Sequence, residues 1–222
     1  MAMVERLPEK PLRAEEHSPS ATALLDAAAA ILSRRNVIDI SLSDVAKESG
    51  LNSALVKYYF GGKEGMLLAL HSRDAYRAVE QMEHLVRMNI SPVAKMRVHI
   101  SGMINTYYRS PYLNRLMHYL IGDGETEAGG KIAQFFVEPI LNAQRAILEQ
   151  GVASGDFRPI DPELFYFSLT GACDHIFYAR HTLLHLRGEG HVTDELRQRY
   201  IKHVTEIYMT TLLTPPPPEA SA

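Results

Sequence analysis

The chain has 222 residues and a nearly balanced charge, with 23 Lys and Arg against 26 Asp and Glu, or −3 in sum. This balance gives no general signal for binding a polyanion, and the single cysteine, Cys173, excludes a disulfide framework and a multi-cysteine zinc site. Because the sequence has no apolar leader and no uninterrupted apolar run of about 18 residues, we expect a cytoplasmic protein without a membrane span.

Apolar residues recur at intervals of three and four along most of the chain, which predicts an all-α fold of about nine helices. The polar, proline-containing ends predict a flexible N-terminal arm at residues 1–17 and a Pro-rich tail at residues 214–222. In chain order, the expected helices are 18–35, 43–49, 53–60, 63–88, 92–110, 111–122, 131–153, 161–187 and 193–213. We expect a loop at residues 123–130 and a kink at Pro139.

Residues 41–60 carry the parts of a helix-turn-helix. A short amphipathic helix opened by Ser41 or Ser43 ends at Gly50, and a second short helix follows the turn. The small residues Ala46 and Gly50 allow the two helices to cross closely. An ordinary helical hairpin has the same geometry, so the pattern alone leaves both a DNA-binding and a purely structural role open.

The exact residues of this segment are more specific. The stretch SLSDVAKESGLNSALVKYYFGGKEGMLLAL resembles the DNA-binding signature of the TetR (tetracycline repressor) family. The typical tail of that signature is present here as Tyr58, Tyr59, Phe60, Gly61, Gly62, Lys63, Glu64 and Leu67. The sequence departs from the family pattern at Asn36, where Gly is usual, and at Lys57, where Tyr is frequent. The resemblance implies a three-helix DNA-binding domain with the helix-turn-helix at residues 18–64, and a helical domain for ligand sensing and dimerisation at residues 65–213.

The resemblance identifies the chain as a DNA-binding transcriptional regulator, in the first place a repressor that a small-molecule inducer releases from a palindromic operator. Activator action remains open. The alternatives are a helical interaction module and an enzyme, neither of which binds DNA. Since Gly-x-Ser-x-Gly, His-Glu-x-x-His and phosphate-loop motifs are absent from the sequence, we expect no catalytic residues and no cofactor. His181 and His185 have the spacing of a metal-binding pair but lack a third ligand, so we expect no metal site.

The third expected helix supplies the candidate contacts to bases. Ser53 and Ala54 at its start can approach base edges, and Lys57 and Tyr58 lie one turn onward on the same side. Tyr59 either donates its hydroxyl to a phosphate or packs on the first helix.

The family resemblance adds contacts to the DNA backbone. It implies that the hydroxyls of Ser41 and Ser43 contact phosphates and that Lys63 anchors the backbone. The complete set of candidate DNA-binding residues is Ser41, Ser43, Asn52, Ser53, Ala54, Lys57, Tyr58, Tyr59 and Lys63.

The mechanism requires a homodimer, because one such domain makes too few contacts for tight, specific binding to operator DNA. The resemblance places the seam between the two copies on the last two helices, as a four-helix bundle. The candidate interface residues are Phe165, Leu169, Ala172, Ile176, Leu183, Ile201, Val204, Ile207 and Tyr208. The same apolar residues also fit the interior of a single chain, so this alternative stays open.

The second half of the chain is rich in aromatic residues and Met, which suit an adaptable apolar cavity with a few orienting polar groups. We therefore expect an effector that is largely apolar, in a pocket whose existence the resemblance implies. The candidate ligand-binding residues are Met103, Tyr107, His118, Phe135, Phe136, Asp174, His175 and Tyr178. Cys173 lies beside small residues and is expected to be a buried packing residue.

Overall fold

A computed structural model describes residues 18–35, 38–122 and 127–214 of the chain. The predicted arm at 1–17, Asn36, part of the predicted loop and the tail from 215 lie outside the described residues. Within them, helices make up the regular structure, apart from one isolated bridge between Phe157 and Leu213, which confirms the all-α prediction. None of the described helices combines the length and the apolar composition that crossing a membrane requires.

The described residues form two compact units that exchange the chain three times. The first unit extends to Arg77 and also includes Tyr112–Val137, while the second comprises Ala78–Pro111 and the residues from Glu138 onward. The helix-turn-helix therefore shares its unit with a later segment of the chain.

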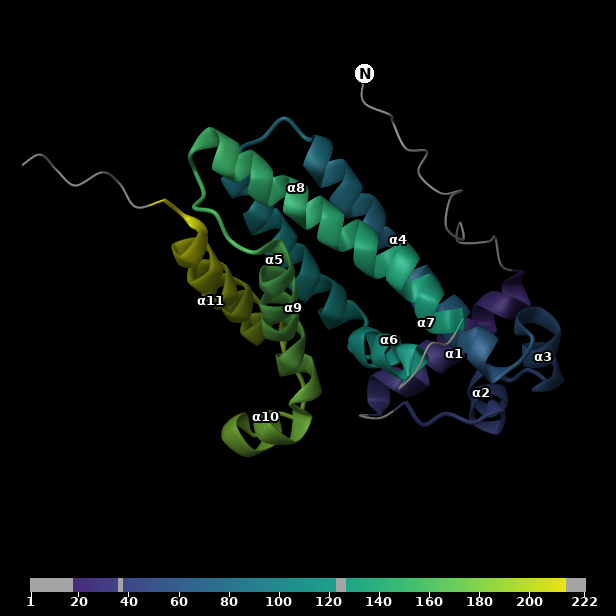
Figure 1. Cartoon of the computed structure of the whole chain (residues 1–222). Coiled ribbons are helices and arrows are strands. Elements are labelled where there is room, and N and C mark those ends of the chain that lie inside the picture. Colours follow the sequence, from purple (N-terminus) through teal and green to yellow (C-terminus); the bar gives the residue numbers. More distant parts are fainter. Residues whose placement is uncertain (1–17, 36–37, 123–126, 215–222) are drawn as a thin grey trace, which may run out of the picture. The chain divides into compact units, whose positions relative to one another are not determined.

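The first unit contains the N-terminal helices and the segment around residues 112–137 (Figure 1). Its elements are α1 (Pro19–Arg34), α2 (Leu42–Ser49), α3 (Ala54–Phe60), the first part of α4 (Lys63–Arg87), α6 (Leu113–Ile121), α7 (Glu127–Ile132) and the π-helix η1 (Ala133–Val137). The start of α1 follows the sequence expectation, because Ser18 accepts a hydrogen bond from the Ala21 amide at 3.3 Å and Pro19 occupies the first turn.

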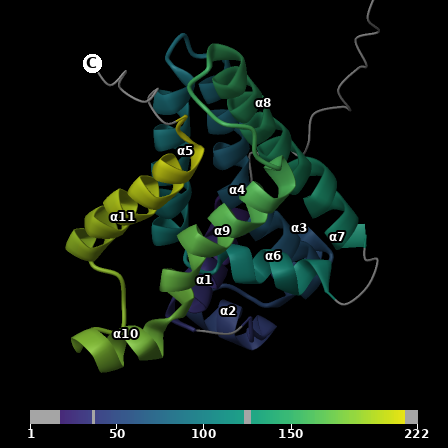
Figure 2. The same ribbon diagram turned by 60° about the vertical axis from the view of Figure 1, so that its left-hand side comes forward.

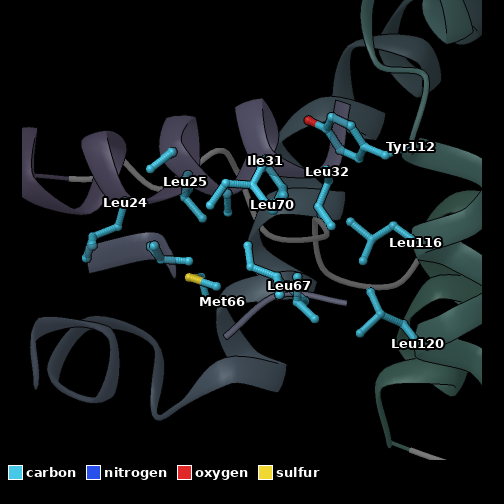
Figure 3. Close-up of a cluster of buried hydrophobic side chains, with 14 of the residues drawn as sticks. Leu24, Leu25, Ile31, Leu32, Met66, Leu67, Leu70, Tyr112, Leu116 and Leu120 are labelled. Atoms are coloured by element: carbon cyan, nitrogen blue, oxygen red, sulfur yellow. The ribbon is translucent and has the colours of Figure 1, made fainter. Parts of the chain in front are cut away.

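A continuous apolar cluster holds the first unit together (Figure 3). Leu24 and Leu32 of α1, Leu67 of α4 and Leu116 of α6 are completely buried in it. Figure 3 shows Leu116 and Leu120 of α6 extending toward the side chains of α1 and α4. Because close-packed interiors tolerate little change in volume, α6 supports the helices that carry the helix-turn-helix.

The second unit is built around α5, which packs against α8, α9 and α11 (Figure 2). Its elements are the rest of α4, α5 (Pro92–Arg109), α8 (Glu138–Ser154), α9 (Pro162–Tyr178), α10 (Arg180–Arg187) and α11 (Asp194–Leu212). At the end of α8, Gly151 lies against the Phe157 ring so closely that an added Cβ would be 1.9 Å from a ring carbon. This position therefore requires glycine.

Polar side chains lie inside the second unit. Lys95 is buried, and its ammonium donates to the Val86 carbonyl at 2.7 Å and to Gln150 Oε1 at 2.8 Å. His99 is also buried and donates from Nε2 to Gln144 Oε1 at 3.3 Å. Burial lowers the pKa of His99 from 6.5 to about 4, although the hydrogen bond to Gln144 acts in the opposite direction. His99 is therefore neutral near pH 7.

Two predicted elements are wrong in their extent, and a third differs in form. The expected helix 161–187 is two helices, because Ala179, at φ −80° and ψ 39°, interrupts it. The expected loop at 123–130 is too long, since α7 begins at Glu127. The expected kink at Pro139 takes the form of the π-helix directly before it, because proline has no N–H to donate and its ring would clash with the Phe135 carbonyl in a regular α-helix.

Candidate nucleic-acid interface

The start of α2 is fixed by a capping box between Ser41 and Asp44. The Ser41 hydroxyl accepts from the Asp44 amide at 3.0 Å, and the Asp44 carboxylate accepts from the Ser41 amide at 3.2 Å. This amide hydrogen bond, followed by one from Arg35, lowers the pKa of Asp44. Ser41 and Ser43 are both exposed, and the Ser41 oxygen acts as acceptor in the cap, so its O–H is left as a donor for an outside partner.

Two ion pairs connect the end of α1 with α2. Arg34 donates to both carboxylate oxygens of Glu48, at 3.1 and 2.7 Å, and Arg35 pairs with Asp44 at 3.2 Å. Exposed pairs of this kind contribute little stability, but the two-point geometry of Arg34 and Glu48 orients α2 along α1.

The turn between α2 and α3 combines a left-handed glycine with an asparagine cap. Gly50 has φ of 70°, and the Asn52 side-chain oxygen accepts from the Ala54 amide at 2.8 Å. Ser53 makes no capping hydrogen bond with its side chain. Asn52 therefore positions the start of α3, and its side-chain NH₂ is the group left to meet DNA. The strong preference of Asn for helix starts is the sequence signal for this role.

The helix α3 has one buried face and one exposed face. Val56 is fully buried, and Tyr59 and Phe60 pack against the apolar cluster of the first unit. On the other face, Ala54, Lys57 and Tyr58 are exposed, with Tyr58 at 79%.

Tyr58 is held by its neighbour in spite of this exposure. Its ring packs edge-on against Tyr59, with the centroids 4.9 Å apart. The packing of Tyr59 foreseen as an alternative is thus present, and donation from its hydroxyl to a phosphate stays a prediction.

Lys63 begins α4, directly beyond the α3 face. Gly61 and Gly62, with φ of 74° and 143°, make the bend that separates the two helices, so Lys63 is set beside the end of α3. Lys63 is partly exposed, and α3 itself contains no acidic residue. The exposed hydroxyls, amide and ammonium groups of α2, α3 and the α4 start form a surface that can donate hydrogen bonds to phosphates and base edges.

Hydrogen bonds that sequence analysis missed connect α4 and α6 with α1. Arg73 of α4 donates to Asp74 at 2.8 Å and to Asp26 of α1 at 2.7 Å, and the Tyr112 hydroxyl donates to Asp74. Arg115 of α6 donates to the Arg35 carbonyl at the end of α1, at 3.3 Å. These partners are far apart in sequence, so no spacing rule could have revealed them.

The eight candidate ligand residues divide between the units. In the second unit, Tyr107 is buried and Met103 and Asp174 are partly buried. Burial, with the charge of Asp174 nearby, raises the pKa of Tyr107 well above its usual range. His175 and Tyr178, on the same unit, are exposed on α9.

The other three candidates belong to the first unit. His118 is exposed, while Phe135 and Phe136 are partly buried in η1. The Phe136 ring packs edge-on against His71 of α4, with centroids 5.2 Å apart. The eight residues therefore do not form a single cluster within either unit.

The candidate interface residues also fall into two groups. Phe165, Leu169, Leu183 and Val204 are buried within their own chain, so they offer no surface to a second copy. The remaining candidates are partly or fully exposed, and they are Ala172, Ile176, Ile201, Ile207 and Tyr208.

Sequence analysis missed two exposed apolar residues of α9. Leu164 is 68% exposed and Phe167 is 70% exposed. Because α9 is apolar around most of its circumference, periodicity alone does not separate its inner face from its outer face.

Two family models match the sequence. Residues 24–70 match the model of the bacterial regulatory proteins of the tetR family, and residues 89–217 match that of the tetracyclin repressor-like C-terminal domain. The second match alone spans more than half of the 222 residues.

Curated proteins similar to this chain are also regulators. The chain is 22% identical to the fatty acid metabolism regulator protein of Bacillus subtilis (strain 168) over 144 residues, which make up 65% of this chain and 74% of that protein. It is 37% identical to the HTH-type transcriptional regulator BetI of Brucella abortus (strain 2308) over 60 residues, 27% of each chain. The chain thus spans about a quarter of the length of the second relative.

Solved structures share the fold at low sequence identity. The transcriptional regulator FadR from Bacillus subtilis in complex with stearoyl-CoA has a TM-score of 0.66 at 19% identity, over 86% of this chain and 98% of that one. A ketosteroid transcriptional regulator of Mycobacterium tuberculosis has a TM-score of 0.67 at 15% identity, over 91% of this chain and 100% of that one.

Proposed function

Because the chain belongs to the TetR family of bacterial regulatory proteins and is thus a DNA-binding transcriptional regulator, we propose that it represses genes whose operators it binds as a dimer. The observation that carries this proposal is the exposed face of α3 with Ala54, Lys57 and Tyr58, set on a rigid apolar cluster. We assign residues 18–64 as the DNA-reading domain and 65–213 as the domain for sensing and dimerisation.

The α3 face suits the major groove. Ser53, Ala54 and Lys57 are the groups proposed to meet base edges, and a lysine at this position favours guanine oxygen and nitrogen acceptors. The hydroxyls of Ser41 and Ser43 and the ammonium of Lys63 are proposed to hold phosphates on either side. Asn52 and the two tyrosines complete the surface. Specificity then lies in α3, and most of the salt-dependent affinity lies in the backbone contacts.

The exposed face of α9 supports dimerisation. Leu164, Phe167, Gly171 and Tyr178 are exposed and follow one another at helical intervals, and Ile207 of α11 is half exposed. Such a contiguous apolar face favours pairing with its own symmetry mate in an isologous interface. We therefore assign the dimer seam to these exposed residues of α9 and α11.

The names of similar proteins support an apolar effector. One relative regulates fatty acid metabolism, one solved structure contains stearoyl-CoA, and another belongs to a ketosteroid regulator. In this chain, Met103, Tyr107 and Asp174 of α5 and α9 are proposed to contact such an effector. An inducer that binds the DNA-free form better by about 1 to 3 kcal/mol would weaken operator binding roughly 5- to 150-fold.

The continuous helix α4 offers a path for this coupling. Its residues up to Arg77 belong to the first unit and those from Ala78 to the second, so one rigid element takes part in both. Displacement of its second half by a ligand would change the spacing of the two α3 helices in the dimer, which must match one helical turn of DNA.

Selection of bound sequences from a random DNA library tests the proposal. We expect enrichment of a pseudo-palindrome with half-sites about one turn or a multiple of it apart, and a solution mass of about 50 kDa, twice the chain mass of 24.9 kDa. Phe167→Glu should give monomers that lose the palindrome, because it places a charge in the seam. Val98→Glu, at an exposed apolar residue of α5, is the matched control and should behave as wild type.

A monomeric wild type would overturn the dimer assignment. Selection that enriches no sequence from a folded dimer would instead favour the interaction module considered above.

A further inference from the structure

A cavity of about 90 Å³ lies in the second unit where α9 gives way to α10. Its walls include Tyr108 of α5, Phe177 of α9, Leu183 of α10 and Val192 of the segment before α11. These side chains are aromatic or aliphatic, so the interior of the cavity is apolar. Of the candidate ligand residues, none lines this cavity, and the proposed function does not use it.

The interruption between α9 and α10 creates the cavity. A continuous helix would carry Arg180 and Leu183 straight on along the axis of α9. Instead the chain changes direction at Ala179, as Figure 2 shows for α9 and α10. Gly188, with φ of 75°, then ends α10, and the following segment brings His191 and Val192 to the same cavity as Phe177. The departure from the sequence expectation is thus what forms this site.

One wall of the cavity is held in place by a second layer of contacts. The Arg197 guanidinium lies over the Tyr108 ring, 4.7 Å from its centroid, and donates to Asp194 at 2.8 Å and to Asn105. The Tyr108 and Phe177 rings pack edge-on with centroids 6.4 Å apart. Because this wall is already ordered, binding a ligand against it costs little side-chain entropy.

The polar groups of the cavity favour an anion. Arg180 and His191 contribute to its lining, and no Asp or Glu does so among the described residues. A guanidinium is always charged and offers paired N–H donors that match a carboxylate, and the exposed imidazole of His191 adds a further donor.

The volume restricts the apolar part of the ligand. An apolar cavity of roughly 150 Å³ encloses benzene, so the 90 Å³ here is too small for an enclosed ring and fits a short alkyl chain. We propose that this cavity binds a short-chain carboxylate, with its alkyl chain against Tyr108, Phe177 and Leu183 and its carboxylate at Arg180 and His191. This binding is independent of DNA and goes beyond the proposed function.

Calorimetric titration of the full-length protein with acetate, propionate, butyrate, valerate and hexanoate tests the ligand class. Affinity should rise roughly fourfold for each methylene that the cavity buries and then stop rising when the cavity is full. Butyramide, which has the same shape as butyrate without its charge, should bind at least about tenfold more weakly. Absence of saturable binding across the series, or equal binding of the amide and the acid, would overturn the proposal.

Variants locate the site. Arg180→Gln should weaken butyrate binding roughly ten- to hundredfold, the usual range for losing a hydrogen bond to a charged group. Arg187→Gln is the matched control, since Arg187 is exposed on the same helix and does not line the cavity. If Arg180→Gln alters the thermal unfolding of the protein, His191→Gln on the exposed rim provides the second reading and should weaken binding several-fold.

Butyrate binding that is unchanged in both Arg180→Gln and His191→Gln would place the ligand elsewhere and refute the site. Because these titrations contain no DNA, their result stands apart from that of the operator selection.

Discussion

The two compact units stabilise themselves in different ways. The first buries a continuous apolar cluster from α1, α4 and α6, and most of its charged hydrogen bonds lie near the surface. The second encloses Lys95, His99 and Gln144 within its helices, each with named hydrogen-bond partners. A volume-packed unit depends on the fit of its side chains, whereas a unit with buried polar groups depends on keeping each partner in place. This difference suits a rigid DNA-reading surface and a sensing region whose interior can favour particular ligands.

The largest expected effect comes from opening a void in the first unit. Leu116→Ala should lower the free energy of unfolding by about 2 to 5 kcal/mol, because Leu116 is completely buried in the cluster. Tyr119→Ala, on the exposed side of the same helix, should change it by no more than about 0.5 kcal/mol. Urea denaturation measures both. Equal effects of the two substitutions would show that α6 does not share the core of the first unit.

Acidification compares a buried histidine in each unit. Burial lowers the pKa of both His71 and His99 from 6.5 to about 4. Since the folded pKa lies below the unfolded one, the stability from each neutral ring is present above pH 6.5 and is lost as the pH falls toward 4. Between pH 7 and pH 5 we expect a loss of about 2 kcal/mol per histidine.

Leucine substitutions distinguish these two histidines. His71 Nε2 has no hydrogen-bond partner among the described residues, so His71→Leu should change stability at pH 7 by less than about 1 kcal/mol. His99→Leu leaves Gln144 Oε1 without its donor and should cost about 1 to 3 kcal/mol. Each variant should lose its share of the acid sensitivity in urea denaturation. Retention of the full wild-type pH dependence by both would contradict the assignment.

The smallest expected effect comes from the hydrogen bond of Tyr112. Tyr112→Phe removes the hydroxyl that donates to Asp74, while Arg73 still binds that carboxylate, so we expect a loss of about 1 kcal/mol. Tyr119→Phe on the same helix is the control and should match wild type in thermal unfolding. A Tyr112→Phe protein as stable as this control would mean that the hydroxyl adds nothing to the first unit.

Much of the first unit could be predicted from sequence because its signals are local. Capping by Ser18, the glycine at the helix-turn-helix turn and the alternation of inward and outward residues on α3 all act within a few positions of the chain. The family signature covers the same stretch. Those features gave the fold class and the candidate DNA surface, although the cap that Asn52 supplies to α3 went unnoticed.

The remaining features depend on contacts between distant parts of the sequence. Nothing near Leu169 distinguishes burial within one chain from burial between two chains, since both need an apolar side chain. The break at Ala179 is equally hidden, because alanine is the best helix former and the interruption arises from packing. Arg115 reaches a carbonyl 80 positions earlier in the chain, which no periodic pattern encodes.

The base preference of Lys57→Ala tests most directly the central claim that the exposed face of α3 reads DNA. In the same library selection, this variant should still enrich a pseudo-palindrome but with altered bases at one position of each half-site. Lys63→Ala, measured alongside, should keep the wild-type bases while its affinity falls and its salt slope decreases by about one. Wild-type base preference and affinity in Lys57→Ala would contradict the claim, because the most prominent charge of the α3 face would then have no part in reading the operator.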